Sequence, residues 1–276
     1  MARRRRYRKA KRNLSVVLLL IAVVAFIQCS MKGQDAADDN NSHKKQGDEV
    51  TDVRSNPAQK CVEVDYKGFT VGFNPEMHIP NWVAWELTKE ETYGTAPRYN
   101  FFSSDPDVKG SAEKWDYNYS GYDRGHMAPA GDMKWDEEVM RNTFYMTNIC
   151  PQAKSLNTGT WKKLEEKCRE WARSTGSLII ICGPVLTDDI TEFIGDNKVA
   201  VPERFFKVIL SPGSKPMRGI GFVMPNGSVP GGLQNAAMSI DEVEAITGHD
   251  FFSALPDSIE SAVESQKDFH YWSTLK

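Results

Sequence analysis

Alternation of apolar and polar residues predicts several β-strands in this chain. Residues 61–66 and 82–88 alternate as a half-buried strand should, and Val83, Trp85 and Leu87 share one face of the second segment. Five further segments are strand candidates. Residues 178–182, one of the five, are apolar on both faces, which favours a central place in a sheet. The five segments are 100–103, 144–149, 178–182, 204–210 and 219–224.

A second period predicts helices in the C-terminal half. Four apolar residues recur at helical spacing over residues 161–171 and would form a buried stripe. Ser239 and Glu242 have the spacing of a capping box, in which each side chain binds the other residue's backbone N–H. Gly248 is placed to end the short helix that this box begins.

Residues 257–265 are a further helix candidate, and the elements together predict one domain. No repeat, coiled-coil period or second linker divides residues 61–276. We therefore expect an α+β fold with a mixed, largely antiparallel central sheet flanked by helices.

The N-terminus combines a basic block with an apolar run. Eight arginine and lysine residues precede residue 13, and residues 14–27 carry no charge. This order predicts that residues 1–28 are a signal peptide or a membrane signal-anchor that exports the rest of the chain. The uncharged run is short for a membrane span, which favours a signal peptide, but no small-residue cleavage site follows it.

Cys29 adds a third outcome, because it directly follows the apolar run and precedes a polar segment, as in a bacterial lipoprotein. Gln28 is an unusual residue before a lipidated cysteine. Lipidation of Cys29 or a retained anchor would hold the protein at a membrane of the cell envelope, whereas cleavage would secrete it. These three alternatives stay open.

Residues 29–60 are almost free of apolar side chains and predict a disordered polar tether. The domain is then expected at residues 61–276. The whole chain has a formal net charge of −3, but without residues 1–28 it keeps 26 basic and 37 acidic residues, a net charge of −11. A broad basic surface for a polyanion is therefore not expected, and any attraction for phosphate must be local.

Four cysteines remain in the predicted domain: Cys61, Cys150, Cys168 and Cys182. An exported domain can form disulfides, but the spacing of these residues does not reveal a pairing. No C-x-x-C pair occurs, which argues against a zinc site. We expect at least two of the four to be buried thiols.

The densest candidate chemistry is the run Asp123, Arg124, Gly125 and His126. A histidine with an ordinary pKa can take a proton from water at neutral pH, and an arginine fork matches phosphate oxygens. Glycine between them allows a backbone or a phosphate to approach. Taken alone, this run fits a salt-bridged surface turn equally well. The remaining histidines have no comparable neighbours and are expected to be structural or exposed: His43, His78, His249 and His270.

Asn157 and Glu165 are the second candidate pair. On one regular helix, eight residues apart, their side chains would project to the same side. Mg²⁺ takes oxygen ligands, keeps several waters and needs only one or two protein groups. The ordinary alternatives are a helix cap for Asn157 and a solvated helix face for Glu165.

Three segments together resemble the DNA/RNA non-specific endonuclease family of ββα-metal nucleases. They are DRGHMAPAGD (123–132), FYMTNICPQ (144–152) and LNTGTWKKLE (156–165), in the family's order and with similar separations. The likeness spans about residues 80 to 225, and residues 94–98 resemble the segment that carries a further active-site arginine, here Arg98. Residues 158–160 depart from an amide-rich stretch in many relatives but leave Asn157 in place.

The resemblance implies a ββα-metal active-site motif and a role for each matching residue. His126 would be the general base, and Asn157 would be the direct protein ligand of one Mg²⁺, which Mn²⁺ can replace. Glu165 would hold metal-bound waters, while Arg124 and Arg98 would stabilise charge on the phosphate.

Asn148 and Arg169 match positions that support the site. The implied reaction is hydrolysis of DNA and RNA phosphodiesters without base specificity, leaving 5′-phosphate and 3′-hydroxyl ends. Relatives include dimers and monomers, so a homodimer is one expected assembly.

Two rival hypotheses remain. A catalytically silent nucleic-acid-binding envelope protein of the same fold would be expected to have lost His126, Asn157 or Glu165, and all three are present. A phosphodiesterase for another substrate is favoured only by the acidic charge of the predicted domain. The nuclease is the preferred hypothesis.

Overall fold

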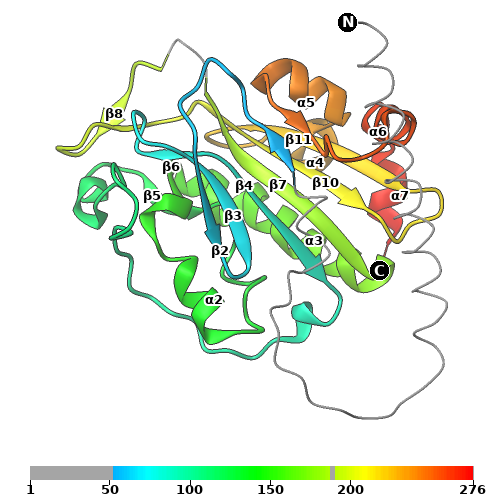
Figure 1. Cartoon of the computed structure of the whole chain (residues 1–276), viewed down its shortest axis with the longest axis horizontal. Coiled ribbons are helices and arrows are strands. Elements are labelled where there is room, and N and C mark those ends of the chain that lie inside the picture. The colour runs from blue at the N-terminus through cyan, green and yellow to red at the C-terminus, as the bar shows by residue number, and fades with distance from the viewer. Residues whose placement is uncertain (1–51, 187–189, 276) are drawn as a thin grey trace, which may run out of the picture.

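The computed structural model describes residues 52–186 and 190–275. The predicted signal segment, Cys29 and the first part of the predicted tether lie outside the described residues. The described part is built on a seven-stranded antiparallel sheet (Figure 1). Its strands, in spatial order, are β12 (Ala237–Met238), β11 (Arg218–Pro225), β10 (Arg204–Ser211), β7 (Ser177–Val185), β4 (Ile79–Thr88), β3 (Phe69–Asn74) and β2 (Val62–Tyr66).

The sheet confirms the predicted α+β class and the central strand. β7 lies between β10 and β4, and both pairings are antiparallel. Its apolar side chains serve two cores, because Ile179 and Ile181 pack on one face and Ile180 packs on the other. A strand that is covered on both faces needs apolar residues at every position, which explains its lack of alternation.

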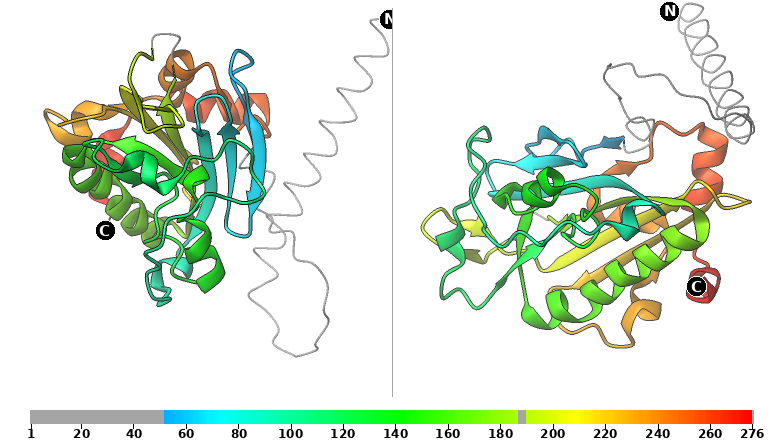
Figure 2. Two further views of the ribbon diagram at one scale, coloured as in Figure 1. Left: turned by 90° about the vertical axis from the view of Figure 1, so that its left-hand side faces the viewer. Right: turned by 90° about the horizontal axis from the view of Figure 1, so that it is seen from below.

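Helices cover both faces of the sheet. α3 (Lys162–Thr175) runs along one face, as Figure 2 shows, and its apolar stripe packs there on Trp85 and Ile180 in a single core. The other described helices are α2 (Glu137–Asn142), α4 (Gly232–Ala236), α5 (Ile240–Thr247), α6 (Asp257–Glu264) and α7 (Phe269–Thr274).

The local signals for α5 are confirmed in detail. Ser239 Oγ accepts from the backbone N–H of Glu242 at 3.1 Å, and the Glu242 carboxylate accepts from the backbone N–H of Ser239 at 2.7 Å. Gly248 ends the helix in the left-handed conformation with φ 72°. This is the αL geometry that a glycine adopts without a steric penalty.

α5 and α6 pack on the face opposite α3, together with a short ribbon of β1 (Val53–Arg54) and β13 (Asp250–Phe251). Val53 pairs with Phe251, and its side chain is buried. Residues 53–54 therefore belong to the fold, although the sequence placed them in the tether and expected the domain to begin near Cys61.

A separate antiparallel ribbon carries the candidate chemistry. It consists of β5 (Asp123–His126) and β6 (Ile149–Gln152), in which His126 stands opposite Ile149. The chain then passes through a wide helical turn, Leu156–Trp161, into α3, which completes a ββα arrangement. A further small hairpin is formed by β8 (Phe193–Ile194) and β9 (Val199–Ala200).

Two predicted strands are wrong. Residues 100–103 contribute only one isolated bridge, between Ser103 and Tyr145. In 144–149 the strand begins only at Ile149, after a 3₁₀ turn at Met146–Asn148. Asn148, the polar residue that interrupts the apolar run, is fully buried. Its side chain binds the backbone N–H and carbonyl of Ala128, so this segment holds a neighbouring backbone segment in place and does not pair as a strand.

The four cysteines of the described domain are free thiols. Cys150, Cys168 and Cys182 are buried, which agrees with the expectation of at least two buried thiols, while Cys61 is partly exposed. Each buried thiol fills space in the main core, where cysteine behaves as a small apolar side chain.

Candidate active site

The β5–β6 ribbon fixes the backbone of the Asp-Arg-Gly-His run. Gly125 lies opposite Cys150, and a Cβ at this position would collide with the side chain of Gln152. The run is therefore a strand that needs glycine for close packing, and not the exposed turn that the sequence alone allowed. Arg124 and His126, two residues apart, lie on the same side of β5.

His126 stands in an aromatic environment. Its ring lies 4.8 Å from the ring centroid of Phe144 and 5.4 Å from that of Phe102. The Nε2 atom is buried and has no hydrogen-bond partner among the described residues. Burial, and then the positive charge of Arg98, lower the pKa of His126 to about 3, so the imidazole is neutral at pH 7. This pKa lies below the ordinary value that the sequence analysis assumed, and it makes the free imidazole a weaker base.

Arg98 is brought to the same place from a distant loop. Its guanidinium lies 5.1 Å from the centroid of the Phe144 ring, on the ring that also contacts His126. The charge of Arg98 lowers the pKa of both His126 and Glu165. The structure thus places this exposed cation beside the other candidate residues.

Arg124, on β5, is held by the segment that precedes this strand. Its guanidinium donates to the carbonyl oxygen of Lys114 and, at 3.0 Å, to Oδ1 of Asn118. It also lies over the rings of Phe102 and Tyr117, at 5.6 and 5.7 Å. Phe102 therefore contacts both Arg124 and His126, and the fixed guanidinium presents a cation near the imidazole.

Asn157 lies in the wide turn before α3. Its side-chain Nδ2 donates to Oδ2 of Asp123 at 3.0 Å, which leaves the amide oxygen directed away from that carboxylate. Gly159, with φ −105° and ψ −113°, breaks the helical geometry between Asn157 and Glu165. The prediction that both residues share one side of a continuous helix is therefore wrong, since the helix is interrupted between them.

Glu165, in the first turn of α3, is surrounded by charged groups. Burial raises its pKa to about 7, while the cations of Lys207, Arg169 and Arg98 lower it and the Asp132 carboxylate raises it. A carboxylate in such a place is poised to bind a cation or metal-bound water, because an added positive charge would favour its ionised form.

Two sets of hydrogen bonds support this arrangement, one centred on Asp132 and one on Asn148. Arg169 donates to Oδ1 of Asp132 at 2.7 Å, and Trp85 Nε1 donates to Oδ2 at 3.2 Å. Burial raises the pKa of Asp132, and the arginine opposes this shift. Asn148 binds both the N–H and the carbonyl of Ala128, at 2.8 and 2.9 Å, and so fixes the backbone two residues beyond His126.

Lys207 is a residue that the sequence analysis missed. It is 1% exposed, and its Nζ lies 4.5 Å from the ring centroid of Trp161 and 5.0 Å from that of Trp85. Its ammonium has no hydrogen bond of normal geometry within the described part of the chain. The available signal was one lysine within the otherwise apolar stretch 205–210 of a predicted strand.

The charge of Lys207 is balanced by its neighbours. Burial lowers the pKa of Lys207. Its electrostatic interactions raise the pKa by more than burial lowers it, so the pKa lies above its usual value; the partners are Cys182, Cys168, Glu165 and Asp132. The charged form of Lys207 is therefore favoured by its interaction with Glu165 and Asp132. Its charge offsets part of the negative charge of an ionised Glu165.

The oxygen atoms around the turn suit a hard divalent cation. The amide oxygen of Asn157 is oriented by Asp123, and Glu165 supplies a carboxylate with a raised pKa. Mg²⁺ prefers such ligands and retains waters at its other positions. The residues present therefore fit the metal that the sequence motifs imply.

Comparisons with known proteins confirm the family that the sequence motifs resemble. The family model for "DNA/RNA non-specific endonuclease" matches residues 47–258. A mitochondrial nuclease EXOG of Danio rerio is 36% identical over 207 residues, which are 69% of this chain and 60% of that protein. A nuclease of Nostoc sp. is 32% identical over 216 residues, which are 72% of this chain and 76% of the relative.

The fold is also found in a solved structure. A crystal structure of EndoG in complex with EndoGI matches with a TM-score of 0.65 and 28% sequence identity, covering 70% of this chain and 86% of that one. The chain spans between 56% and 60% of the length of the four EXOG relatives that it matches.

The relatives contradict the expected export. Nucleases similar to this chain in Danio rerio, mouse, fission yeast and budding yeast are described as mitochondrial. The expectation of an envelope-anchored, lipidated or secreted protein is therefore wrong. An arginine-rich N-terminus without acidic residues is common to several targeting segments, so this composition does not identify export. Within the described residues, no helix is long and apolar enough to cross a membrane.

Proposed function

Because the chain belongs to the DNA/RNA non-specific endonuclease family, we propose that it is a divalent-metal-dependent endonuclease that cuts DNA and RNA without base specificity. The observation that carries the proposal is the meeting of three separated motifs. Asn157 from the turn before α3 is hydrogen-bonded to Asp123 of β5, and His126 ends the same strand. Arg98 reaches the ring of Phe144 that contacts His126.

His126 acts as the general base. Its buried Nε2 is unpartnered within the described residues, and the neutral imidazole accepts a proton from the attacking water. A phosphodiester anion nearby would raise the lowered pKa of His126 toward its usual range, because negative charge favours imidazolium. Proton transfer and approach of the substrate are therefore coupled.

The arginines bind the phosphate. Arg124 is held by Lys114 and Asn118, and its position over aromatic rings limits its motion. Cations fixed in this way stabilise the charge that develops on the phosphate without reorganising in the transition state. Arg98 is more exposed and meets the substrate from the opposite loop.

Asn157 would bind Mg²⁺, or Mn²⁺ in its place, and Glu165 would hold its waters. A bound cation would supply charge neutralisation at the phosphate and at the departing 3′ oxygen. Asp123 orients the amide of Asn157, while Lys207 and Arg169 limit the negative charge beneath Glu165. Departure of the 3′ oxygen would leave 5′-phosphate products.

No base-reading surface is required by this chemistry. The candidate residues address a phosphate and its attacking water, which are the same in every nucleotide. Since the chain apart from residues 1–28 has a net charge of −11, substrate capture depends on the local cations Arg98 and Arg124.

The test is cleavage of plasmid DNA and of a structured RNA by the full chain. We expect both to be degraded with Mg²⁺ or Mn²⁺, to survive in EDTA, and to carry 5′-phosphate ends. The variant Asn157→Ala should lose activity, whereas Asn235→Ala, an exposed change on α4, should keep it. Intact nucleic acid with either metal, combined with cleavage of a small phosphodiester, would replace the nuclease proposal by one for another phosphodiesterase.

A further inference from the structure

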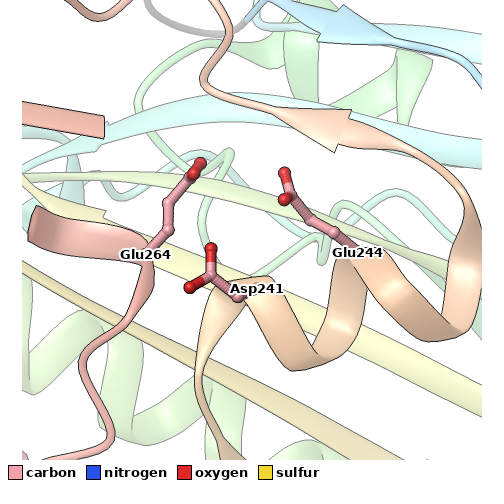
Figure 3. A group of neighbouring side chains, drawn as sticks. All are labelled: Asp241, Glu244 and Glu264. Atoms are coloured by element: carbon pink, nitrogen blue, oxygen red, sulfur yellow. The ribbon is translucent and has the colours of Figure 1, made fainter. Parts of the chain in front are cut away.

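Three carboxylates meet on the face of the sheet opposite α3. Asp241 and Glu244 come from α5, and Glu264 comes from the last position of α6 (Figure 3). One oxygen from each lies within 4.8 Å of the others. Figure 1 shows the two helices side by side and well away from β5 and β6, so this group is separate from the proposed catalytic site.

Glu264 is the unusual member of the group. Only 5% of its surface is exposed, and its Oε1 is buried without a hydrogen-bond partner among the described residues. Figure 3 shows its carboxylate directed toward the space that Asp241 and Glu244 also face. A buried carboxylate oxygen without a partner is costly, since it loses its hydration and gains nothing in return.

The surrounding charges increase this cost. Glu244, Glu260, Asp241 and Asp250 all raise the pKa of Glu264 beyond the effect of burial, to about 9. Arg54 pairs with Asp250 at 2.9 Å, and Lys267 pairs with Glu242 at 3.2 Å. Glu244 accepts one hydrogen bond, from the backbone N–H of Phe251 at 2.7 Å, which holds its side chain in place.

A divalent cation satisfies all of these groups at once. The ligand set contains only carboxylate oxygens, which hard cations prefer to the softer transition metals. Two ligands of one ion can be separated by at most twice the metal–oxygen distance, which is about 4.6–5.2 Å for Ca²⁺ and about 4.0–4.2 Å for Mg²⁺. A group whose oxygens lie within 4.8 Å of one another is compatible with Ca²⁺, whose longer bonds and flexible coordination tolerate the wider separations.

We propose that Asp241, Glu244 and Glu264 bind a Ca²⁺ ion that joins α5 to α6. The two helices contribute Ile240, Val243 and Val263 to one core and contact each other directly. An ion between them adds a link at the polar rim of that core. The site is structural: it stabilises the C-terminal helices and leaves the phosphodiester chemistry to the other face of the sheet.

The test is thermal unfolding of the metal-free full chain during titration with CaCl₂. We expect the wild-type melting temperature to rise by several degrees when Ca²⁺ exceeds its dissociation constant about 100-fold. Asn157→Ala should show the same rise, because it alters only the proposed catalytic metal ligand. Glu264→Gln and Asp241→Asn should lose it. Both substitutions remove repulsion, so the metal-free variants are expected to be at least as stable as the wild type.

Glu260→Gln is the matched control. It removes a negative charge from α6 near the group but none of its three ligands. Glu260→Gln should keep most of the Ca²⁺-dependent rise. A wild type that gains no stability from Ca²⁺, or a Glu264→Gln variant that gains as much as the wild type, would overturn the site and assign the carboxylates to proton binding. Neither result bears on nuclease activity, which is measured separately.

Discussion

The carboxylate of Asp123 accepts a hydrogen bond of 3.0 Å from the side-chain amide of Asn157, 34 residues later in the chain. This contact joins the first strand of the β5–β6 ribbon to the turn before α3. The hydrogen bond uses the side-chain nitrogen of Asn157, so the side-chain oxygen remains available as a ligand. A metal ligand is oriented in this way by a neighbour that does not bind the metal itself.

Asp123→Ala is therefore expected to weaken metal binding without removing the ligand. Loss of such an orienting partner costs about 10- to 100-fold in metal affinity or activity. The measurement is the cleavage rate as a function of Mg²⁺ concentration, with half-saturation moved upward and the rate partly recovered at high Mg²⁺. Asp107→Ala, at an exposed loop position, is the control. An unchanged Mg²⁺ dependence would show that the hydrogen bond from Asn157 to Asp123 is not needed to orient the Asn157 amide.

His126→Ala tests the assignment of the general base. We expect kcat to fall by about 10²- to 10⁴-fold, because proton transfer by the imidazole is lost. The melting temperature should change little, because Phe102 and Phe144 still fill the neighbouring space. His270→Ala, on the exposed side of α7, should have wild-type kcat. Equal activity of the two variants would remove His126 from the mechanism.

Arg98→Ala is expected to lower kcat/KM by about 10- to 1000-fold, since one fixed cation is lost at the phosphate. Arg98→Lys should recover only part of this loss, because an ammonium cannot reproduce the planar fork of a guanidinium. Arg141→Ala, exposed on α2, is the control for the loss of one positive charge. If Arg141→Ala weakens cleavage as much as Arg98→Ala does, the effect is one of net charge alone.

The strongest local patterns in the sequence predicted the fold well. β7 and the helix begun by Ser239 rest on signals contained within a few residues, an apolar run and a capping box, and both are confirmed. The sequence of β5 fitted a salt-bridged surface turn equally well, since aspartate and glycine are depleted in strands. Its strand conformation depends on pairing with β6 and on the packing of Gln152, which are tertiary contacts.

The sequence predicted which residues belong to the candidate site but not how their side chains are arranged in space. The helical spacing from Asn157 to Glu165 failed because Gly159 breaks the helix, and no periodicity reveals such a break. Lys207 was missed because its importance comes from burial between Trp161 and Trp85, residues far from it in sequence. A charge is informative only once the surrounding side chains are known to exclude water.

Lys207→Met tests whether that buried cation adjusts Glu165. Lys207 lowers the pKa of Glu165, which burial raises to about 7, so its removal should raise that pKa further. The acid limb of the pH profile of kcat/KM should then move to higher pH, since the proposed mechanism needs ionised Glu165. Methionine fills the volume of the lysine stem, so the core packing should be kept, while the loss of the buried cation beside Glu165 and Asp132 lowers stability. Lys163→Met, exposed on α3, should leave the profile unchanged, and an unmoved limb in Lys207→Met would contradict this role.

Glu264 makes a prediction for the pH dependence of stability in the absence of metal. Burial and the neighbouring carboxylates raise its pKa to about 9 in the folded state, against 4.5 for the unperturbed group. The folded protein therefore binds the proton more tightly, so this contribution to stability is complete below about pH 4.5 and is lost as the pH rises through 9. Glu244, whose pKa is raised to about 7, acts in the same direction.

The measurement is urea unfolding in EGTA at pH 5, 7 and 9. The Glu264→Gln variant should become progressively more stable relative to the wild type as the pH rises. The Glu90→Gln variant, an exposed change elsewhere, should have the same pH dependence as the wild type. A difference that stays constant with pH would mean that Glu264 ionises normally in the fold.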